Sequence, residues 1–533
     1  MLKIRSRYLL FVFALLIIGC AKRGNITGGF KDTLAPVLLE SVPKNFRTNF
    51  TGNEIKLYFD EYVKLKDVNK QLIVSPPMNT APVVTPTNAS KFLTIKIKDT
   101  LQPETTYSLN FGQSIQDNNE GNIYPQFKYV FSTGSYIDSL SISGTIQDAL
   151  ETESDNFVTV MLYEMNEKFT DSTIYKQKPR YVTNTLDSAT TFKIENIKAG
   201  TYQIIALKDK NNNFLYNPGK EKIAFLKEPI IIGAENKSYN LKLFAEKVQV
   251  KTFKPSQASG NRATLGYEGN VKEAKIILKN GSETLKTIVT QLPDKDSVQV
   301  WFPTVKADSL QMSFSLGNYS KNYNFKIKDQ KKDSLSFSAK PVGGIDFRKK
   351  FEITSTVPLT QFDKSKMSLT NKDSVAVDFT TEYDEFNQKL FFNFIKEPEQ
   401  KYNVTLLPGA LTDFYERKND TLQYKLSTKG TGDYGNLTMK LENLKSFPVI
   451  VQLTDNKGKV LDSEYLESEP VATFNLIQPG VFRVRFIYDT NKNKEWDPGS
   501  FQNKTQSEEV IYFPKEIDVR ANWDVDQPFT LSP

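Results

Sequence analysis

The chain contains no histidine, and this absence removes several kinds of enzyme chemistry. Histidine is the commonest general base, it activates most serine and cysteine nucleophiles, and it supplies the usual ligands of catalytic zinc. A glycosidase that works with two carboxylates needs no histidine, but the sequence singles out no such pair. We therefore predict that the protein is not an enzyme.

The chain also has little excess of positive over negative charge, and few tryptophans. The formal net charge is only +7, and the excess Lys and Arg residues are scattered, so the sequence shows no nucleic-acid footprint. A protein that binds glycans is expected to expose aromatic platforms, and only three tryptophans are present, at positions 301, 496 and 523.

Cys20 is the only cysteine, so no disulfide can form within the chain. It follows a basic start and an apolar run, residues 8–18, which is shorter than the roughly 20 residues of a membrane span but typical of a signal peptide. The end of this run, Ile17 to Cys20, resembles a bacterial lipobox. The resemblance implies that residues 1–19 are removed and that Cys20 is acylated, for example with palmitate, which anchors a chain without spanning the bilayer. The alternative is an ordinary signal peptide with a chance cysteine.

The residues after Cys20 bear on location. Position 21 is alanine, not aspartate, so nothing resembles an inner-membrane retention signal. We expect a lipid anchor in the outer membrane, with the protein facing the cell surface. Glycines at positions 24, 28 and 29 make residues 20–36 a flexible tether.

Aromatic and β-branched residues are plentiful, and Gly and Pro interrupt short alternations of polar and apolar residues. This composition is typical of all-β proteins. At roughly 100 residues per sandwich, about five domains fit. We predict an all-β chain of tandem β-sandwiches.

The first sandwich is expected over residues 37–134. Residues 54–59 (EIKLYF) alternate polar and apolar, and residues 92–111 (FLTIKIKDTLQPETTYSLNF) hold two strands joined at a proline turn. Asp117 and the GN pair at 121–122 correspond to a D-x-x-G-N loop, and with it these motifs resemble the SbsA-like bacterial Ig-like domain. The resemblance implies a β-sandwich used for surface display and spacing, without catalytic residues.

Further units follow the first. A weaker Ig-like copy is expected at 341–428, where the D-x-x-G-N loop is missing. The units at 135–245 and 429–533 share a second repeat, and the motif AGTYQI in the first of them resembles a carboxypeptidase-regulatory or Cna B-type sandwich of prealbumin-like fold. Residues 246–340 form a further predicted sandwich without family signal. The predicted order is A-B-C-A′-B′, a string of five beads. Module A is 37–134, B is 135–245, C is 246–340, A′ is 341–428 and B′ is 429–533.

Modules B and B′ repeat one loop at an offset of 280 residues: KDKNNNFLYNPG (208–219) and YDTNKNKEWDPG (488–499). Oxygen-bearing side chains at loop positions 1, 3, 5 and 9 are what a Ca²⁺ loop needs, although position 6 is not glycine and position 12 is not glutamate. Alternatively, Asn and Asp are there for the backbone angles of a tight turn. The candidate calcium ligands are Asp489, Asn491, Asn493 and Asp497 in the second loop, and Asp209, Asn211, Asn213, Asn217 and Glu221 in the first.

Two further expectations concern this loop. Glu508 and Glu509 can join the second copy only by folding back. Trp496 aligns with Tyr216, so both are expected to pack in a core beneath the turn.

Asp-Ser or Asp-Thr followed by a small or aliphatic residue recurs ten times, more often than composition suggests. The pattern resembles the O-glycosylation acceptor motif of exported Bacteroidota proteins, which implies sugar on some of the hydroxyls. The alternative is a turn that leads into a strand, and we expect several hydroxyls to face inward. The candidate acceptors are Thr33, Thr100, Ser139, Ser172, Ser188, Ser297, Ser309, Ser334, Ser374 and Thr421.

As a whole the chain resembles Ig-like outer-membrane lipoproteins of the Bacteroidota, from the lipobox through TGGFKD (27–32) to the first Ig-like unit. This favours a non-catalytic scaffold that binds protein partners, for example as an accessory subunit of an outer-membrane β-barrel complex in barrel assembly, export or uptake. The alternative is a glycan-binding or adhesive surface protein. No cofactor other than Ca²⁺ is expected.

Overall fold

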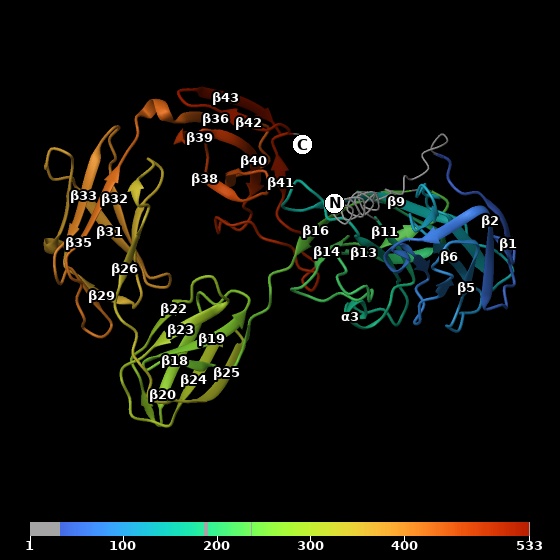
Figure 1. The fold of residues 1–533 in the computed structure, drawn as a ribbon, viewed down its shortest axis with the longest axis horizontal. Helices are drawn as coiled ribbons and strands as arrows, with labels where there is room; N and C mark the ends of the chain where they lie inside the picture. The colour runs from blue at the N-terminus through green and yellow to red at the C-terminus, as the bar shows by residue number, and fades with distance from the viewer. Residues whose placement is uncertain (1–31, 186–189, 236, 532–533) are drawn as a thin grey trace, which may run out of the picture. The chain divides into compact units, whose positions relative to one another are not determined.

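The computed structural model describes residues 32–185, 190–235 and 237–531. The chain divides into two compact units, the first ending at Asp138 and the second beginning at Ser139. Strands dominate both units (Figure 1), so the all-β prediction is confirmed. No helix among the described residues is long and apolar enough to cross a membrane.

The first unit, module A, is a sandwich of two sheets. One sheet has the order β1-β2-β5-β4 with β7 paired to β2, and the other has the order β3-β6-β8. Its elements are β1 (Leu38–Val42), β2 (Glu54–Leu65), α2 (Val68–Gln71), β3 (Ile73–Ser75), β4 (Val83–Thr85), β5 (Ser90–Lys96), β6 (Thr106–Asn110), β7 (Ile115–Asp117) and β8 (Lys128–Ser132).

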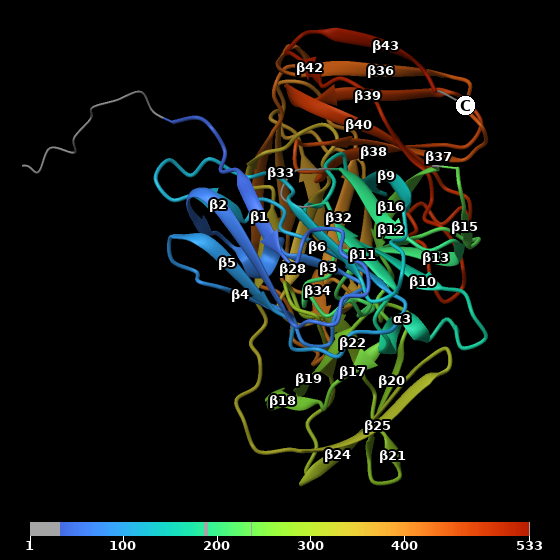
Figure 2. The same cartoon turned by 90° about the vertical axis from the view of Figure 1, so that its right-hand side faces the viewer.

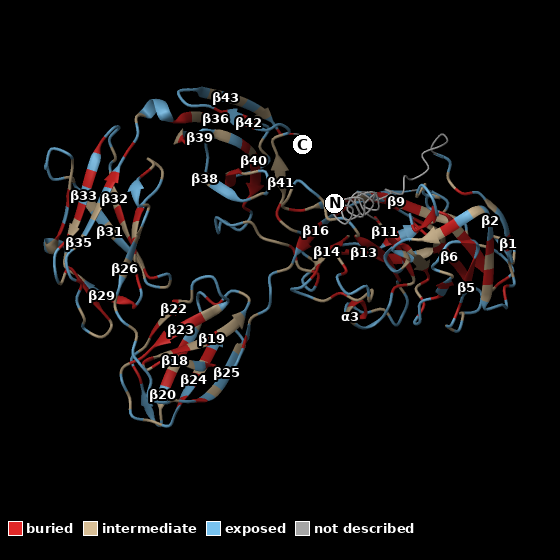
Figure 3. Cartoon of the chain, in the orientation of Figure 1, coloured by how far each residue is buried: buried red, intermediate tan, exposed pale blue. Residues whose placement is uncertain are grey.

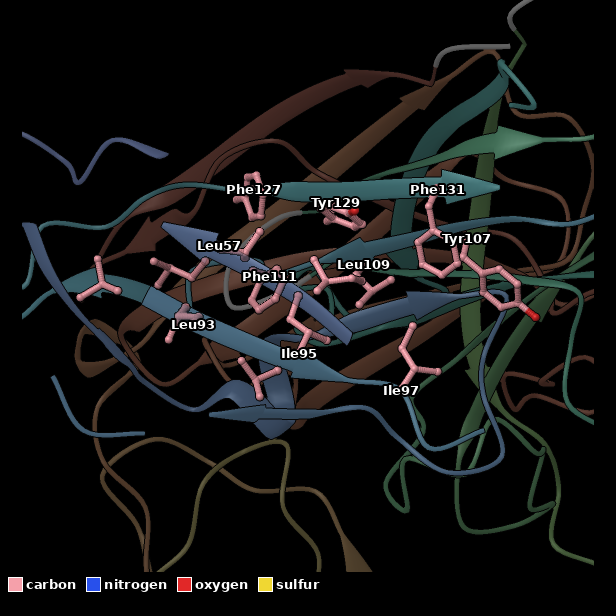
Figure 4. Close-up of a cluster of buried hydrophobic side chains, with 14 of the residues drawn as sticks. Leu57, Leu93, Ile95, Ile97, Tyr107, Leu109, Phe111, Phe127, Tyr129 and Phe131 are labelled. Carbon is pink, nitrogen blue, oxygen red and sulfur yellow. The ribbon is translucent and has the colours of Figure 1, made fainter. Parts of the chain in front are cut away.

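The core of module A lies between these two sheets (Figure 4). Alternate residues of a strand point to opposite faces, and Leu57 and Leu93 of the larger sheet point inward, toward Leu109 and Tyr129 of the smaller one. All four side chains are fully buried. The alternation of EIKLYF therefore does produce a sheet with one buried face.

Module B carries one extended eight-stranded sheet with the order β11-β10-β13-β14-β16-β9-β12, in which β15 also pairs with β13. Strands β16 and β9 run parallel. The elements are β9 (Leu140–Asp148), β10 (Thr159–Glu164), α3 (Thr173–Lys176), β11 (Tyr181–Asn184), β12 (Thr191–Ile197), β13 (Gly200–Leu207), β14 (Lys222–Phe225), β15 (Ile230–Ile232) and β16 (Ser238–Ala245).

Module B′ repeats most of the strand pairing of module B but divides into two sheets, β39-β36-β43 and β38-β37-β40-β41 with β42 on β40. Its first and last strands run parallel and side by side (Figure 2), as in module B, and its central strand pairs with the second, sixth and seventh strands. The strands are β36 (Gly435–Glu442), β37 (Val449–Thr454), β38 (Val460–Leu466), β39 (Val471–Ile477), β40 (Gly480–Tyr488), β41 (Val510–Tyr512), β42 (Ile517–Val519) and β43 (Asp524–Thr530).

Module C is a sandwich of the sheets β17-β19-β23-β22, with β18 on β19, and β21-β20-β24-β25. The buried residues of each module lie along its strands, and exposed residues predominate in the loops (Figure 3). The strands of module C are β17 (Lys251–Thr252), β18 (Ser256–Ser259), β19 (Arg262–Glu268), β20 (Lys275–Asn280), β21 (Glu283–Thr284), β22 (Ile288–Gln291), β23 (Ser297–Trp301), β24 (Ser309–Leu316) and β25 (Tyr319–Lys326).

Module A′ combines the sheets β26-β28-β32-β31, β27-β35-β33-β30 and β29-β34. Strand β26 pairs with β28, so this module begins before the predicted residue 341. Its elements are β26 (Phe337–Lys340), β27 (Gly343–Gly344), β28 (Phe351–Ser355), β29 (Leu359–Phe362), η1 (Lys364–Lys366), β30 (Met367–Thr370), β31 (Phe379–Asp384), β32 (Lys389–Phe394), β33 (Lys401–Leu406), β34 (Leu411–Asp413) and β35 (Leu422–Ser427), followed by η2 (Thr431–Asp433).

Candidate functional site

The repeated loops follow β13 and β40, and both are built around a buried aspartate. Oδ2 of Asp209 accepts a hydrogen bond from the amide of Phe214 at 2.8 Å, and Oδ2 of Asp489 accepts one from the amide of Lys494 at 2.9 Å. Phe214 and Lys494 both have positive φ angles, 59° and 65°. The two loops therefore share one backbone path, and the first aspartate of each fixes it.

A glutamate closes each loop from the other side. The two carboxylate oxygens of Glu221 accept bonds from the amides of Lys210 and Asn217, and those of Glu508 accept bonds from the amides of Thr490 and Asp497. Glu508 therefore does fold back to join the second loop.

The return to Glu508 requires extra chain. Glu508 lies 287 residues after Glu221, seven more than the repeat offset of 280, so the second copy contains a seven-residue insertion. The strand pairing supports this insertion. Ile205 pairs with Phe225 in module B, and the residues 280 and 287 positions later, Arg485 and Tyr512, pair in module B′. We call the inserted residues 500–506 the strap.

The oxygens proposed to bind calcium are engaged within the second loop and its neighbour. The side-chain amides of Asn491 and Asn493 donate to Oδ2 of Asp497, and Nζ of Lys247 contacts Oδ1 of the same residue. Burial raises the pKa of Asp497, but Lys247 and the two amides outweigh burial and leave that pKa below its ordinary value. A positive charge thus already balances this carboxylate.

In the first loop, Asp209 and Glu221 likewise accept hydrogen bonds from backbone amides. No group of three or more Asp, Glu, Cys or His residues in the described part of the chain is arranged to hold a metal ion. The donor set in this arrangement fits the turn better than a cation, and calcium binding stays a prediction from the spacing.

Calcium has a direct test. If it binds the folded chain with a Kd near 10⁻⁴ M, millimolar Ca²⁺ should stabilise module B′ by about 1 to 1.5 kcal/mol, because ligand binding to the native state adds RT ln(1 + [L]/Kd). Met439 is fully buried in this module, so peroxide oxidises it readily only when the module unfolds. The oxidation rate across a urea titration therefore gives the unfolding midpoint. Identical midpoints in Ca²⁺, Mg²⁺ and chelator would contradict calcium binding.

The strap packs on module B. The Phe501 side chain is fully buried, its ring lies 5.2 Å from that of Phe225 on β14, and it is edge-on to Tyr175 in the C-terminal half of α3. The Phe501 amide donates to Glu246, the residue that follows β16. At Gly499 a Cβ would lie 2.5 Å from the Phe244 ring, so only glycine permits this close approach.

A second contact joins β40 and β41 to the loop after β9. Arg485 is buried, its Nη1 lies 3.5 Å from Oε1 of Glu151, and the Tyr512 hydroxyl donates to the Leu150 carbonyl at 2.7 Å. Nη1 of Arg483 donates to the Thr152 hydroxyl at 2.7 Å. Modules B and B′ therefore contact each other, although modules C and A′ separate them in the sequence.

The other junctions also use specific side chains. Between C and A′, Trp301 packs with Val357, and the Tyr415 hydroxyl donates to the Asn261 carbonyl at 2.9 Å. Between A′ and B′, Arg348 pairs with Asp462 and Glu464.

A cavity of about 750 Å³ adjoins the strap and is lined in part by Glu246, Lys247, Glu268, Tyr319 and Asp497. Its charged groups carry both signs, and Lys247 and Asp497 pair with each other. It contains neither a histidine nor a cysteine, and its lining suggests no particular chemistry.

The D-x-x-G-N loop of module A is a turn held by Asp117. This buried carboxylate accepts amide bonds from Glu120, Gly121 and Asn122 at 2.7, 3.1 and 2.6 Å. In module A′ the glycine and asparagine are gone, but Asp413 still closes the turn by accepting from the amide and side chain of Arg417. The aspartate therefore retains its structural role.

The predicted glycan acceptors are mostly accessible. One acceptor, Ser188, lies outside the described residues, as does Cys20, the predicted lipid site. Of the other nine acceptors, eight are exposed and Ser297 is half-buried, so the expectation that several face inward is wrong. Ser297 and Ser309 begin β23 and β24, and the next residues, Val298 and Leu310, are buried. The aliphatic residue enters the core, and the hydroxyl points away from it.

The tryptophans do not form a platform. Trp301 is buried at the C–A′ junction, Trp523 is half exposed, and Trp496 is half-buried, whereas its counterpart Tyr216 is fully buried. The expectation of a core position is thus met by Tyr216 and only partly by Trp496. Module A instead exposes the cross-strand pair Tyr58 and Phe92, whose ring centroids lie 6.3 Å apart.

Residues 32–133 match the family described as bacterial Ig-like domain. The first unit is Ig-like. The match covers module A alone and assigns no family to the remainder of the chain. No curated protein matches the chain.

Several solved structures of tandem domains align over much of the chain at low similarity. The alignment with the surface layer protein SbsC, domains 1–6, covers 91% of this chain and 67% of the SbsC chain, at 10% identity and a TM-score of 0.15. Immunoglobulin domains 1–5 of Sidekick-1 cover 94% and 100% at 12% identity with a TM-score of 0.12. At these TM-scores the alignments carry no argument about arrangement or activity.

Proposed function

We propose that the protein is a non-catalytic scaffold of the cell surface, anchored in the outer membrane by lipid on Cys20. The Ig-like module A and the absence of histidine from the sequence support this proposal. The observation that carries it is the use of buried Trp301, Arg485 and Phe501 at junctions between modules. Such contacts hold neighbouring modules against one another, as a scaffold that positions partners requires.

The partner of such a scaffold is proposed to be an outer-membrane protein complex, for example a β-barrel complex in assembly, export or uptake. Affinity purification from detergent-solubilised membranes tests this. A barrel protein recovered in stoichiometric amount would support it. A monomer that retains polysaccharide would instead favour the second candidate, glycan binding or adhesion, for which the exposed Tyr58–Phe92 pair is the specific observation.

Replacing Cys20 with alanine should remove the anchor. Without the thiol there is no acylation site, and the apolar run of residues 8–18 is too short to span a bilayer. We expect the variant in a soluble fraction, or with its signal peptide uncleaved, when membranes are separated by density. Outer-membrane fractionation that persists at high salt would show that lipid on Cys20 is not the main anchor.

Glycosylation of the Asp-Ser and Asp-Thr sites is proposed for a subset of the exposed hydroxyls. The intact mass of the natively expressed protein should then exceed polypeptide plus lipid by sugar increments. Asp32 precedes the exposed Thr33, and Asp32→Ala should remove one increment. An unmodified mass after native expression would contradict the proposal for the whole set.

A further inference from the structure

We propose that the strap, residues 500–506, locks module B′ onto module B, so that the modules from Ser139 onward form one rigid closed body rather than a hinged chain. The inference goes beyond the proposed scaffold function and does not depend on the lipid anchor.

The strap is not needed for its own loop. The first copy closes the same turn without any insertion, with Glu221 in the place of Glu508 and the same pair of backbone amides as donors. The extra residues therefore serve something other than turn closure.

The apolar anchor of the strap belongs to the neighbouring module. Phe501 is fully buried but is absent from the hydrophobic core of its own module, B′. Its ring partners, Phe225 and Tyr175, both come from module B. Burial of a large aromatic side chain at the centre of a contact is the usual pattern of an interface hot spot.

Polar contacts surround this anchor, and three of them join the strap to module B or its exit segment. Nε2 of Gln506 donates to the Phe225 carbonyl at 3.0 Å, and Nζ of Lys504 pairs with Asp171 at 2.7 Å. The same Nζ lies 3.5 Å from the centroid of the Phe501 ring. The Phe501 amide is satisfied by Glu246. The Phe501 amide, the Gln506 side chain and the Lys504 ammonium group are thus all paired when the strap is docked.

A second contact area makes the docking rigid. Arg485 and Tyr512 of module B′ bind the Leu150 carbonyl and Glu151 on a different loop of module B. One contact point permits rotation, whereas two separate ones fix an orientation. Modules C and A′ lie between B and B′ in sequence. Trp301 joins C to A′ and Arg348 joins A′ to B′, so the B–B′ contact connects the end of this series back to module B.

The lock can be tested by pulsed electron paramagnetic resonance on the full chain carrying Cys20→Ser, which frees the protein of other thiols. Spin labels are placed at Lys242→Cys on β16 and Thr473→Cys on β39, two exposed positions in modules B and B′. The unaltered strap should give one narrow distance distribution. Phe501→Ser, or deletion of residues 500–506, should broaden it.

Controls separate the lock from general damage. Phe501→Leu keeps an apolar anchor and should retain a narrow peak, as should Ile231→Ser, which replaces an equally apolar but exposed residue of module B. The deletion leaves a loop of the length found in the first copy, so module B′ should keep its circular dichroism spectrum. A narrow peak after deletion, or a broad one in the unaltered chain, would overturn the proposal.

Discussion

Replacing Asp489 with alanine should lower the free energy of unfolding of module B′ by about 3 kcal/mol, because partly buried donors would lose their charged acceptor. Asp489 is 1% exposed as a residue, and its carboxylate accepts bonds from the amides of Asn493 and Lys494 and from the Tyr465 hydroxyl. The measurement is the urea midpoint of Met439 oxidation, since Met439 is fully buried in the same module.

A matched control lies in the same module. Asp455 also accepts two backbone amides, from Lys457 and Lys459, but both bonds are exposed to solvent. Water can replace those bonds, so Asp455→Ala should cost about 1 kcal/mol or less. Asp489→Asn retains one acceptor oxygen and should fall between the two. Equal midpoints for Asp489→Ala and Asp455→Ala would show that the buried carboxylate does not organise the loop.

The repeat offset explains why so much of this loop could be predicted. Spacing alone identified Asp209 and Asp489 as equivalent, and the structure gives them the same amide donors at the same loop positions. The same spacing did not identify Glu508 as the counterpart of Glu221, because a seven-residue insertion moves Glu508 out of register. Equivalence became visible only when both carboxylates were seen to accept the corresponding pairs of amides.

The B–B′ contact left a partial signal in the sequence. In an antiparallel sheet with one solvated face, apolar residues alternate with polar ones. Residues 204–207 (IIAL) are instead continuously apolar, and all four are fully buried. Simple alternation would bury only one face of this strand. The continuous run indicates that the second face is covered too, but no local pattern can say which distant segment covers it.

The acceptor hydroxyls show a different limit. A strand that begins Asp-Ser-aliphatic has one residue in the core and its neighbour pointing away. Leu310 enters the core of module C, so the preceding Ser309 must face outward. The period of two residues therefore already predicts exposure at such sites, and the expectation of inward hydroxyls overlooked it.

Replacing Asp117 with alanine should destabilise module A by about 3 kcal/mol, since three buried or half-buried amides lose one charged acceptor. Those amides belong to Glu120, Gly121 and Asn122, and the Asp117 side chain is itself fully buried. Met78 is the reporter, because it lies in the core of module A. Its oxidation midpoint in urea should fall, while that of Met439 in module B′ should not change.

The same carboxylate should make module A sensitive to acid. Burial raises the pKa of Asp117, but the amide bonds from Asn122, Gly121 and Glu120 outweigh burial and hold that pKa below its ordinary 3.8. A lowered pKa in the folded state means that the charged form stabilises the fold above pH 3.8, and that this stabilisation is lost as the pH falls through the lowered value. Asp117→Asn should therefore flatten the acid limb of the Met78 midpoint. Glu120→Gln makes the same charge change in the same loop on an exposed side chain and should leave that limb in place. If both variants retain the acid limb, the pH dependence of module A arises elsewhere.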